Sequence, residues 1–174
     1  YRSMSRYLLP YLQDRPLSLH RFPNGIQGKS FFQKDVNDAP EWVRRVNIPS
    51  ESAAGGSIDY VIIEDEATLA WVANLGTIEL NPWNSRASRA GFPDYLVLDL
   101  DPLDRPFSDV TRVALTIHRI LQAIALPHFP KTSGKSGLHI FLPLGGQYTY
   151  EQARQFAFLI SQLQVMGTND AVPC

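Results

Sequence analysis

Short apolar runs alternate with amphipathic stretches along the chain, and the two patterns predict strands and helices respectively. Strands are expected from residue 17 up to a turn at 23–25 and at residues 31–35, 42–48, 58–63, 77–80, 95–100 and 138–142. Helices are expected over the first dozen residues, at residues 66–75 after an Asp65 cap, at residues 108–125 after a Ser108 cap, and after a Thr149 cap. This order of elements, with mixed connections, predicts an α/β or α+β sandwich.

The apolar positions of the two later helices predict which of their residues face the core. On the first of these helices they are Val110, Val113, Ile117, Ile120, Leu121 and Ile124, and on the last they are Phe156, Leu159, Ile160 and Leu163. Trp42 and Trp71 are also expected in the core. The residues 81–91 and 131–137 are expected to form loops.

The composition is that of a folded chain, with 174 residues of which 44% are hydrophobic. We therefore expect a single domain over residues 1–174, cut at both ends from a longer chain. No run approaches the roughly 18 apolar residues of a membrane helix, so no membrane partner is expected. The single cysteine, Cys174, supports neither a disulfide framework nor a zinc site and fits a reducing cytoplasm. The net charge of -1 excludes a uniformly basic nucleic-acid binder and leaves room for a local basic groove.

Asp99 and Asp101, followed by Pro102, form the sharpest chemical feature of the sequence. Residues two apart in a strand point to the same face, so the two carboxylates are expected to project together, with Cα atoms about 6–7 Å apart. Neighbouring carboxylates repel unless a cation lies between them, and oxygen ligands suit Mg²⁺ or Mn²⁺. In the structural alternative, the carboxylates cap a turn or pair with Arg105.

Residues 131–137, Lys-Thr-Ser-Gly-Lys-Ser-Gly, form a second feature, which is typical of an anion-binding loop. Its glycines let backbone amides approach a phosphate, while Ser133 and Ser136 offer hydroxyls and Lys135 offers a positive charge. His139 follows on the next strand, from which its imidazole could reach a phosphate. The loop is not a Walker A loop, because a strand follows in place of a helix. A plain Gly-Ser hairpin turn with a solvated lysine is the alternative.

Basic and aromatic residues cluster in the first third of the chain, at Arg21, Lys29, Phe31, Phe32 and Lys34. Such a mixture suits stacking on bases and contacts to a phosphate backbone. Strand alternation lets only one of the two phenylalanines face solvent, and burial of both in the core is the alternative. Arg86 is a further candidate phosphate contact, with a merely solvated side chain as the alternative. Three histidines lack metal-ligand spacing and are interpreted as structural: His20, His118 and His128.

Four stretches of the chain occur in a recognisable order: RPLSLHRFPNGIQGKSFFQKD, LGTIELNPWNSR, PDYLVLDLDP and KTSGKSGLHIFLPL. Together they resemble the polymerase domain of prokaryotic end-joining ligase D, a member of the archaeo-eukaryotic primase superfamily. The resemblance implies a primase-polymerase fold, with a mixed β-sheet and an RRM-like catalytic module flanked by helices. It also implies template-directed addition of nucleotides to DNA ends during non-homologous end joining, by two-metal phosphoryl transfer with Mn²⁺ or Mg²⁺.

The resemblance also implies roles for individual residues and a set of partners. The catalytic, metal-binding residues would be Asp99 and Asp101, and Ser133, Lys135 and His139 would hold the phosphates of the nucleotide. The loop pattern adds Ser136 to these nucleotide-binding candidates. Phe31 and Phe32 would pack against template bases. The residue pattern adds the other candidate nucleic-acid contacts, which are Arg21, Lys29, Lys34, Asn81 and Arg86. The implied partners are gapped or overhanging DNA ends, NTPs or dNTPs, a ligase domain in the same polypeptide and a Ku-type end-binding protein. The implied location is the cytoplasm, in association with the nucleoid.

The sequence departs from the family pattern in two places. Asn81 stands where the family usually has His, and an asparagine cannot carry a proton charge. The third metal carboxylate of the family lies on a later strand, which is not recognisable after Leu163, and Asp170 lacks the surrounding motif. A non-catalytic nucleic-acid end-binding module therefore remains an alternative, as does a metal-dependent phosphohydrolase that uses the same aspartate pair.

Overall fold

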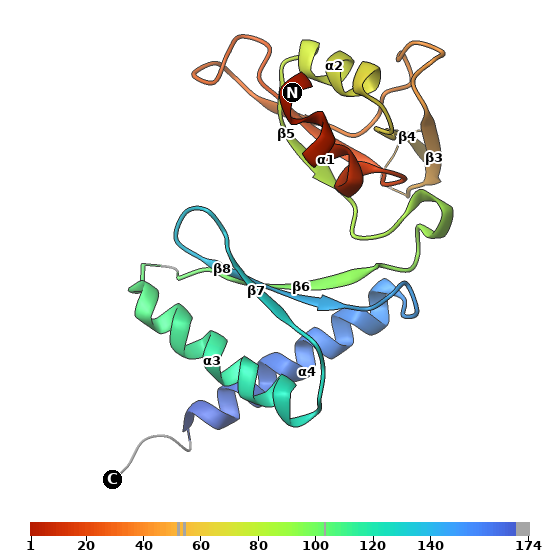
Figure 1. The fold of residues 1–174 in the computed structure, drawn as a ribbon. Coiled ribbons are helices and arrows are strands. Elements are labelled where there is room, and N and C mark those ends of the chain that lie inside the picture. The colour runs from red at the N-terminus through yellow and green to blue at the C-terminus, as the bar shows by residue number, and fades with distance from the viewer. Residues whose placement is uncertain (52, 54, 103, 170–174) are drawn as a thin grey trace. The chain divides into compact units, whose positions relative to one another are not determined.

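The computed structural model describes residues 1–51, 53, 55–102 and 104–169. The chain divides into two compact units, Tyr1–Ala90 and Gly91–Cys174, whose elements are labelled in Figure 1. The division into compact units does not test the expectation of one domain over residues 1–174, which stays a prediction. Asp170 and Cys174 lie outside the described residues. Within the described ranges, no helix is both long and apolar enough to cross a membrane.

A five-stranded antiparallel sheet organises the first unit. Its strands are β1 (Leu17–Arg21), β2 (Phe31–Gln33), β3 (Arg45–Pro49), β4 (Ser57–Val61) and β5 (Thr77–Pro82). They follow the order β2-β1-β4-β3, and β5 pairs along β1. The helices are α1 (Ser5–Leu12) and α2 (Glu66–Asn74), with short 3-10 turns η1 (Arg2–Met4) and η2 (Ala87–Arg89).

The two helices of this unit share a core with β1. Leu17 and Leu19 are fully buried and cluster with Leu12 of α1 and with the apolar side of α2. Because strand side chains alternate, Ser18 and His20 point to the other face of the sheet. The α2 helix begins as predicted after Asp65, whose carboxylate accepts a hydrogen bond from the backbone N–H of Thr68 at 2.7 Å.

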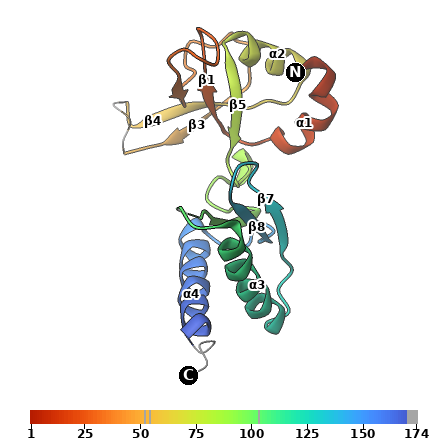
Figure 2. The same ribbon diagram turned by 90° about the vertical axis from the view of Figure 1, so that its left-hand side faces the viewer.

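The second unit is a three-stranded sheet with two helices on one face, as Figures 1 and 2 show. Its elements are β6 (Tyr95–Leu100), α3 (Phe107–Ala123), β7 (Phe129–Thr132), β8 (Leu138–Pro143) and α4 (Tyr150–Asn169). The strand order is β6-β8-β7, and both pairings are antiparallel. The α4 helix begins as predicted at Thr149: its Oγ1 accepts from Gln152 N at 3.2 Å, and Thr149 N donates to the Gln152 side chain at 2.9 Å.

The sheet of the second unit has one apolar face and one mixed face. Ile140 and Leu142 of β8 are buried with Ile117 and Leu121 of α3 and with Ile160 of α4. The alternate residues of β6 and β8 therefore point away from the helices. These residues include Tyr95, Asp99, His139 and Phe141, and the Tyr95 and Phe141 ring centroids lie 5.5 Å apart. The face that carries the predicted catalytic residues is thus the face that the helices of this unit leave uncovered.

The expected fold class is confirmed, since the chain is a mixture of helices and sheets with an RRM-like second unit, β6-α3-β7-β8-α4 in chain order. One detail differs. Every strand pairing among the described residues is antiparallel, whereas a mixed sheet was expected. In the second unit the α3 crossover does return β7 parallel to β6, but β8 lies between these two strands and pairs antiparallel with both.

Several expected core positions are wrong. Trp42 is 56% exposed, because the neighbouring Val43 fills the core and the tryptophan turns outward. On α4 the inward stripe is formed by Ala153, Phe156 and Ile160. Leu159 and Leu163 of α4 were expected in the core but are more than a third exposed. The same is true of Ile124, the C-cap residue of α3.

Several element boundaries differ from the expected ones, and four of the differences are the following. The β3 strand begins at Arg45 and not at residue 42, and β5 continues to Pro82, inside the expected loop at 81–91. The β7 strand was not expected and extends to Thr132, inside the expected loop at 131–137. The α3 helix begins at Phe107 after an N-cap Pro106, so Ser108 is not its cap.

Candidate functional site

Asp99 and His139 are neighbours across the β6–β8 ladder. The antiparallel register pairs these two residues directly, and the Nε2 atom of His139 lies 3.3 Å from Asp99 Oδ1. The Asp99 side chain is 60% exposed and that of His139 29%. Asp99 therefore lies beside His139, and among the described residues it has no contact with Arg105, the partner that the structural alternative suggested.

Asp101 meets the 131–137 loop at Gly137. A Cβ atom on Gly137 would lie 2.7 Å from Asp101 Oδ1, 2.6 Å from the carbonyl oxygen of Leu100 and 3.3 Å from Ser133 Oγ. Real Cβ atoms essentially never approach this closely, so glycine is required for this packing. Residue 137 is two positions before His139, so a Cβ there would point to the same face as His139. The contact of Asp101 with that position supports the prediction that both carboxylates share the uncovered face.

The loop itself is closed by two hydrogen bonds between Ser133 and Gly137. Ser133 N donates to the Gly137 carbonyl at 3.0 Å, and Gly137 N donates to Ser133 Oγ at 2.9 Å. Gly134 has φ +104, a backbone conformation that favours glycine. Lys135 and Ser136 are exposed at the tip. The structure thus places Asp99 beside His139 and places both Asp101 and Ser133 close to Gly137, while Lys135 and Ser136 are exposed on the same loop.

The Asp99–Asp101 pair offers exposed carboxylate oxygens, which are the ligands that Mg²⁺ and Mn²⁺ prefer. Within the described part of the chain, no group of three or more His, Cys, Asp or Glu side chains is placed to hold a metal ion. The two carboxylates could hold a divalent cation only together with other oxygen ligands, such as phosphate oxygens and water. That is the usual arrangement for Mg²⁺, which keeps several waters and binds through one or two carboxylates plus substrate phosphates.

The basic and aromatic residues of the first unit lie around β2. Phe31 and Phe32 are 47% and 61% exposed, so the core alternative is wrong, and so is the expectation that only one of them faces solvent. The reason is that β2 is a short edge strand, paired only with β1, and both of its faces reach solvent. Lys29 and Lys34 are exposed on either side of the phenylalanine pair.

Arg21 and Arg86 are partly buried and bonded within the first unit. Arg21 Nε donates to the Leu75 carbonyl at 2.9 Å, at the end of α2. Arg86 Nη1 donates to the Gln13 carbonyl at 2.6 Å. Asn81 is exposed on β5, opposite Ser18 of β1. Both arginines therefore have structural contacts, and the nucleic-acid role of all three residues stays a prediction.

Two histidine contacts were missed by the sequence reasoning, which treated these residues as structural. His20 lies between Glu79 and Ser30, with its Nδ1 atom 2.8 Å from Glu79 Oε2 and its Nε2 atom 3.0 Å from Ser30 Oγ. His118 Nδ1 lies 2.7 Å from His128 Nε2. No local motif signals either contact, because their partners are brought together by strand pairing and by the α3–β7 connection.

Asp14 forms a polar centre that the sequence did not suggest. Burial alone would raise the pKa of its carboxyl, but hydrogen bonds from Ser88 and Arg44 outweigh burial, so the pKa is lowered. The Ser88 hydroxyl donates to Asp14 Oδ2 at 2.7 Å, and Arg44 Nη2 donates to Oδ1 at 3.0 Å. Together these bonds tie the end of α1 to η2 and to the segment before β3.

Comparison with known proteins identifies the chain. A family model described as "LigD, primase-polymerase domain" matches residues 1–170. The Bifunctional non-homologous end joining protein LigD of Bacillus subtilis is 36% identical over 163 residues, which cover 91% of this chain and 25% of that protein. The Multifunctional non-homologous end joining protein LigD of Pseudomonas aeruginosa is 33% identical over 164 residues, covering 89% of this chain and 18% of that protein. The chain thus spans about a quarter or less of these relatives.

A solved structure points to the same family as these relatives. The polymerase domain from Mycobacterium tuberculosis ligase D, in complex with DNA, superposes with a TM-score of 0.77 at 28% identity, covering 95% of this chain and 60% of that one. The family match extends over nearly the whole chain and includes both compact units. The chain therefore belongs to the LigD primase-polymerase domain family.

Proposed function

We propose that this chain is a template-directed nucleotidyltransferase that adds nucleotides to DNA ends in non-homologous end joining. The observation that carries the proposal is that Asp99 lies beside His139, and that Asp101 and Ser133 both lie close to Gly137, in the second unit. Family membership supports a role in end joining, since the relatives are named as non-homologous end joining proteins. The solved relative was determined in complex with DNA, which supports DNA as a partner.

In this proposal Asp99 and Asp101 hold divalent metal, either Mn²⁺ or Mg²⁺. The bound metal would activate the attacking oxygen and neutralise charge on the triphosphate. Ser133 and Ser136 donate hydroxyl hydrogen bonds to phosphate oxygens, and Lys135 contributes a compact positive charge. His139 is oriented by Asp99, at 3.3 Å, so that its other ring nitrogen is available to a phosphate.

The nucleic-acid side of the proposal rests on the first unit. Phe31 and Phe32 present exposed rings to bases, and Lys29 and Lys34 supply charge for the phosphate backbone. Arg21, Asn81 and Arg86 are the remaining candidates on this unit. We further propose NTPs or dNTPs as substrates, and a ligase domain in the same polypeptide and a Ku-type protein as partners, in a nucleoid-associated setting in the cytoplasm.

A non-catalytic end-binding module is the second candidate. It is favoured by one observation: no third carboxylate joins Asp99 and Asp101 among the described residues. Incorporation of labelled nucleotide into a gapped duplex, with Mn²⁺ or Mg²⁺ present, separates the two functions. Extension that follows the template supports the polymerase, whereas binding of the gapped duplex without any extension supports the end-binding module. Release of phosphate from a nucleoside triphosphate without template would instead indicate a phosphohydrolase.

A further inference from the structure

Phe32 is the most exposed ring of the β2 edge and is nevertheless held in place by stacking. Its ring centroid lies 4.2 Å from that of His20, with only 15° between the two planes. The ring of Phe22 lies 4.4 Å from the same imidazole, tilted by 46°. Phe32 remains 61% exposed, so one aromatic surface is ordered by the imidazole while much of the ring stays accessible.

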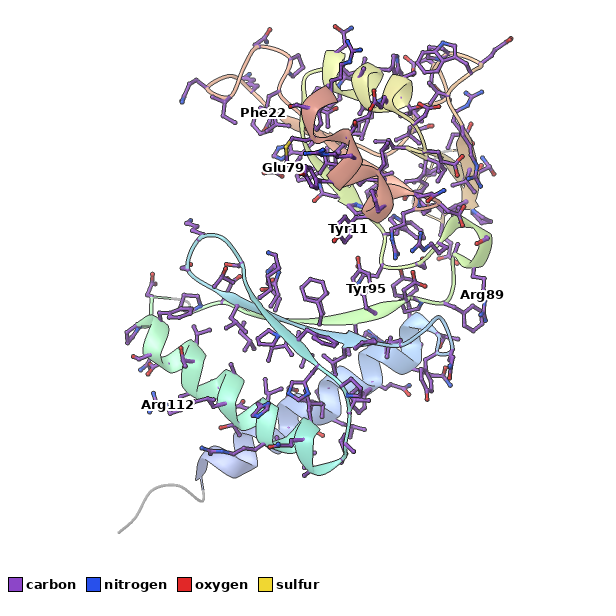
Figure 3. All side chains as sticks on the ribbon, viewed as in Figure 1. Tyr11, Phe22, Glu79, Arg89, Tyr95 and Arg112 are labelled. Atoms are coloured by element: carbon purple, nitrogen blue, oxygen red, sulfur yellow. The ribbon has the colours of Figure 1, made fainter. Side chains whose placement is uncertain are left out.

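The imidazole that supports Phe32 is itself fixed at both ring nitrogens. Nδ1 lies 2.8 Å from Glu79 Oε2, and because a carboxylate only accepts, this nitrogen carries a hydrogen. Nε2 lies 3.0 Å from the Ser30 hydroxyl, in the segment that leads into β2. Only 16% of the His20 side chain is exposed. Figure 3 labels Glu79 of β5, which pairs with His20, and Phe22, which follows the end of β1.

Phe31 has a different environment. The ladder between β1 and β2 pairs Arg21 with Phe31 and His20 with Phe32, so the two phenylalanines point to opposite faces. Phe31 packs against the guanidinium of Arg21, whose Cζ atom lies 5.2 Å from the ring centroid. Arg21 in turn bonds to Leu75, at the C-terminal end of α2. Phe32 alone belongs to the face that carries His20 and Glu79.

We infer that His20 is a positioning residue that holds the Phe32 ring as a stacking platform for an unpaired base of a DNA overhang. Glu79 and Ser30 fix the imidazole that supports the ring. This inference rests on the proposed function, because it takes DNA as the ligand. Its physical basis is preorganisation: a ring that is already ordered loses less side-chain freedom when a base stacks on it.

The test uses the 174-residue chain and a duplex whose single-stranded overhang carries 2-aminopurine, a base analogue with emission that falls on stacking. Phe32→Ala is expected to weaken binding about 5- to 150-fold, the range for one stacked base, and to abolish most of the quenching. His20→Ala is expected to weaken binding about 2- to 12-fold, the range for an aromatic pair, and to reduce the quenching. His20→Phe keeps a supporting ring and should restore most of both signals. His128→Ala, a histidine of the other unit, is the matched control.

A measurement without DNA separates positioning from general damage. Loss of the imidazole ring current in His20→Ala should shift the NMR resonances of the Phe32 ring, while resonances of the buried Leu17 and Leu19 methyls stay close to their wild-type positions. If the wild-type chain binds no overhang, the proposed DNA function is wrong and the inference falls with it. If Phe32→Ala loses quenching but His20→Ala binds and quenches as the wild type does, the inference alone is overturned. Greater loss of quenching in Phe31→Ala than in Phe32→Ala would also overturn it.

Discussion

The two units hold their candidate functional residues by different means. In the second unit the backbone sets the geometry: the β6–β8 register places Asp99 opposite His139, and Gly137 allows the chain to approach Asp101. In the first unit the exposed Phe32 ring is placed by side chains, through the stack with His20 and the bonds to Glu79 and Ser30. The positions of Asp99 and Asp101 should therefore tolerate side-chain changes outside the site. The position of the Phe32 ring should instead be lost step by step as its supporting side chains are removed.

The largest effect is expected at the aspartate pair. Asp99→Ala or Asp101→Ala should lower nucleotide incorporation by more than about 100-fold. Replacing a residue that hydrogen-bonds to a metal ligand typically lowers activity about 10- to 100-fold, and removing the ligand itself should lower it further. Folding should be almost unaffected, because both side chains are exposed. Primer extension and thermal unfolding check the two statements. Asp38→Ala, an exposed carboxylate in the first unit, is the control, and near-wild-type extension by either site variant would refute the metal assignment.

Lys135 should matter for nucleotide affinity more than for folding. Lys135→Ala removes a charge-assisted phosphate contact, which contributes about 1.5–3 kcal/mol. The nucleotide dissociation constant should rise accordingly, while the melting temperature changes little because the side chain is at an exposed loop tip. Calorimetric titration with a nucleoside triphosphate measures the change. Arg119→Ala, an exposed cation of α3, should bind as the wild type does; an equal loss in both variants would point to a general charge effect.

Gly137 tests the role of the backbone directly. A methyl group here would collide with the Leu100 carbonyl oxygen at 2.6 Å, and overpacking of this kind costs about 1–3 kcal/mol. Gly137→Ala should therefore lower the free energy of unfolding and also weaken nucleotide binding, because the shift displaces Ser133 and Asp101 together. Gly91→Ala, where a methyl group meets open space, is the matched control. Unfolding by urea measures stability, and an unchanged Gly137→Ala would show that the close approach is not required.

The smallest effect is expected at Asp14 of the first unit, and it concerns the stability of the fold at acidic pH. Because the folded pKa of Asp14 is lowered, its contribution to stability is complete above the ordinary value of 3.8 and is lost as the pH falls through the folded pKa. Asp14→Asn should lower the free energy of unfolding by about 1 kcal/mol at neutral pH, a modest figure for a partly exposed charged contact. The difference from wild type should shrink below pH 3.8. Denaturant unfolding at several pH values checks this, with Asp38→Asn as control; a constant difference would show that ionisation of Asp14 contributes nothing.

The contrast between the two units also explains what the sequence could predict. Period-two alternation and the Pro102 stop were enough to predict β6 and the common face of Asp99 and Asp101, a prediction that the packing around Gly137 supports. The glycines of the 131–137 segment likewise indicated a loop, and hydrogen bonds between Ser133 and Gly137 close it. These are backbone properties, which depend on residues close in sequence.

Side-chain partners from distant elements were not predictable in this way. The contact between His20 and Glu79 joins residues 59 apart, and it exists only because β5 pairs with β1. Phe31 and Phe32 were expected to divide between core and solvent, yet nothing in their local pattern shows that β2 lies at the edge of its sheet. Trp42 failed for a similar reason, since only the packed structure shows that Val43 takes the core position.

The exposure of Phe31 and Phe32 has a consequence for solubility. An edge strand with two accessible aromatic rings presents unpaired backbone groups and apolar surface to other molecules, which is a template for strand-to-strand association. Lys29 and Lys34 lie on either side of this short strand, and flanking charges of this kind oppose such association by mutual repulsion. The two lysines proposed to contact DNA therefore also protect the strand between them. Neutralising them would remove the proposed phosphate contacts and a barrier to self-association in the same step.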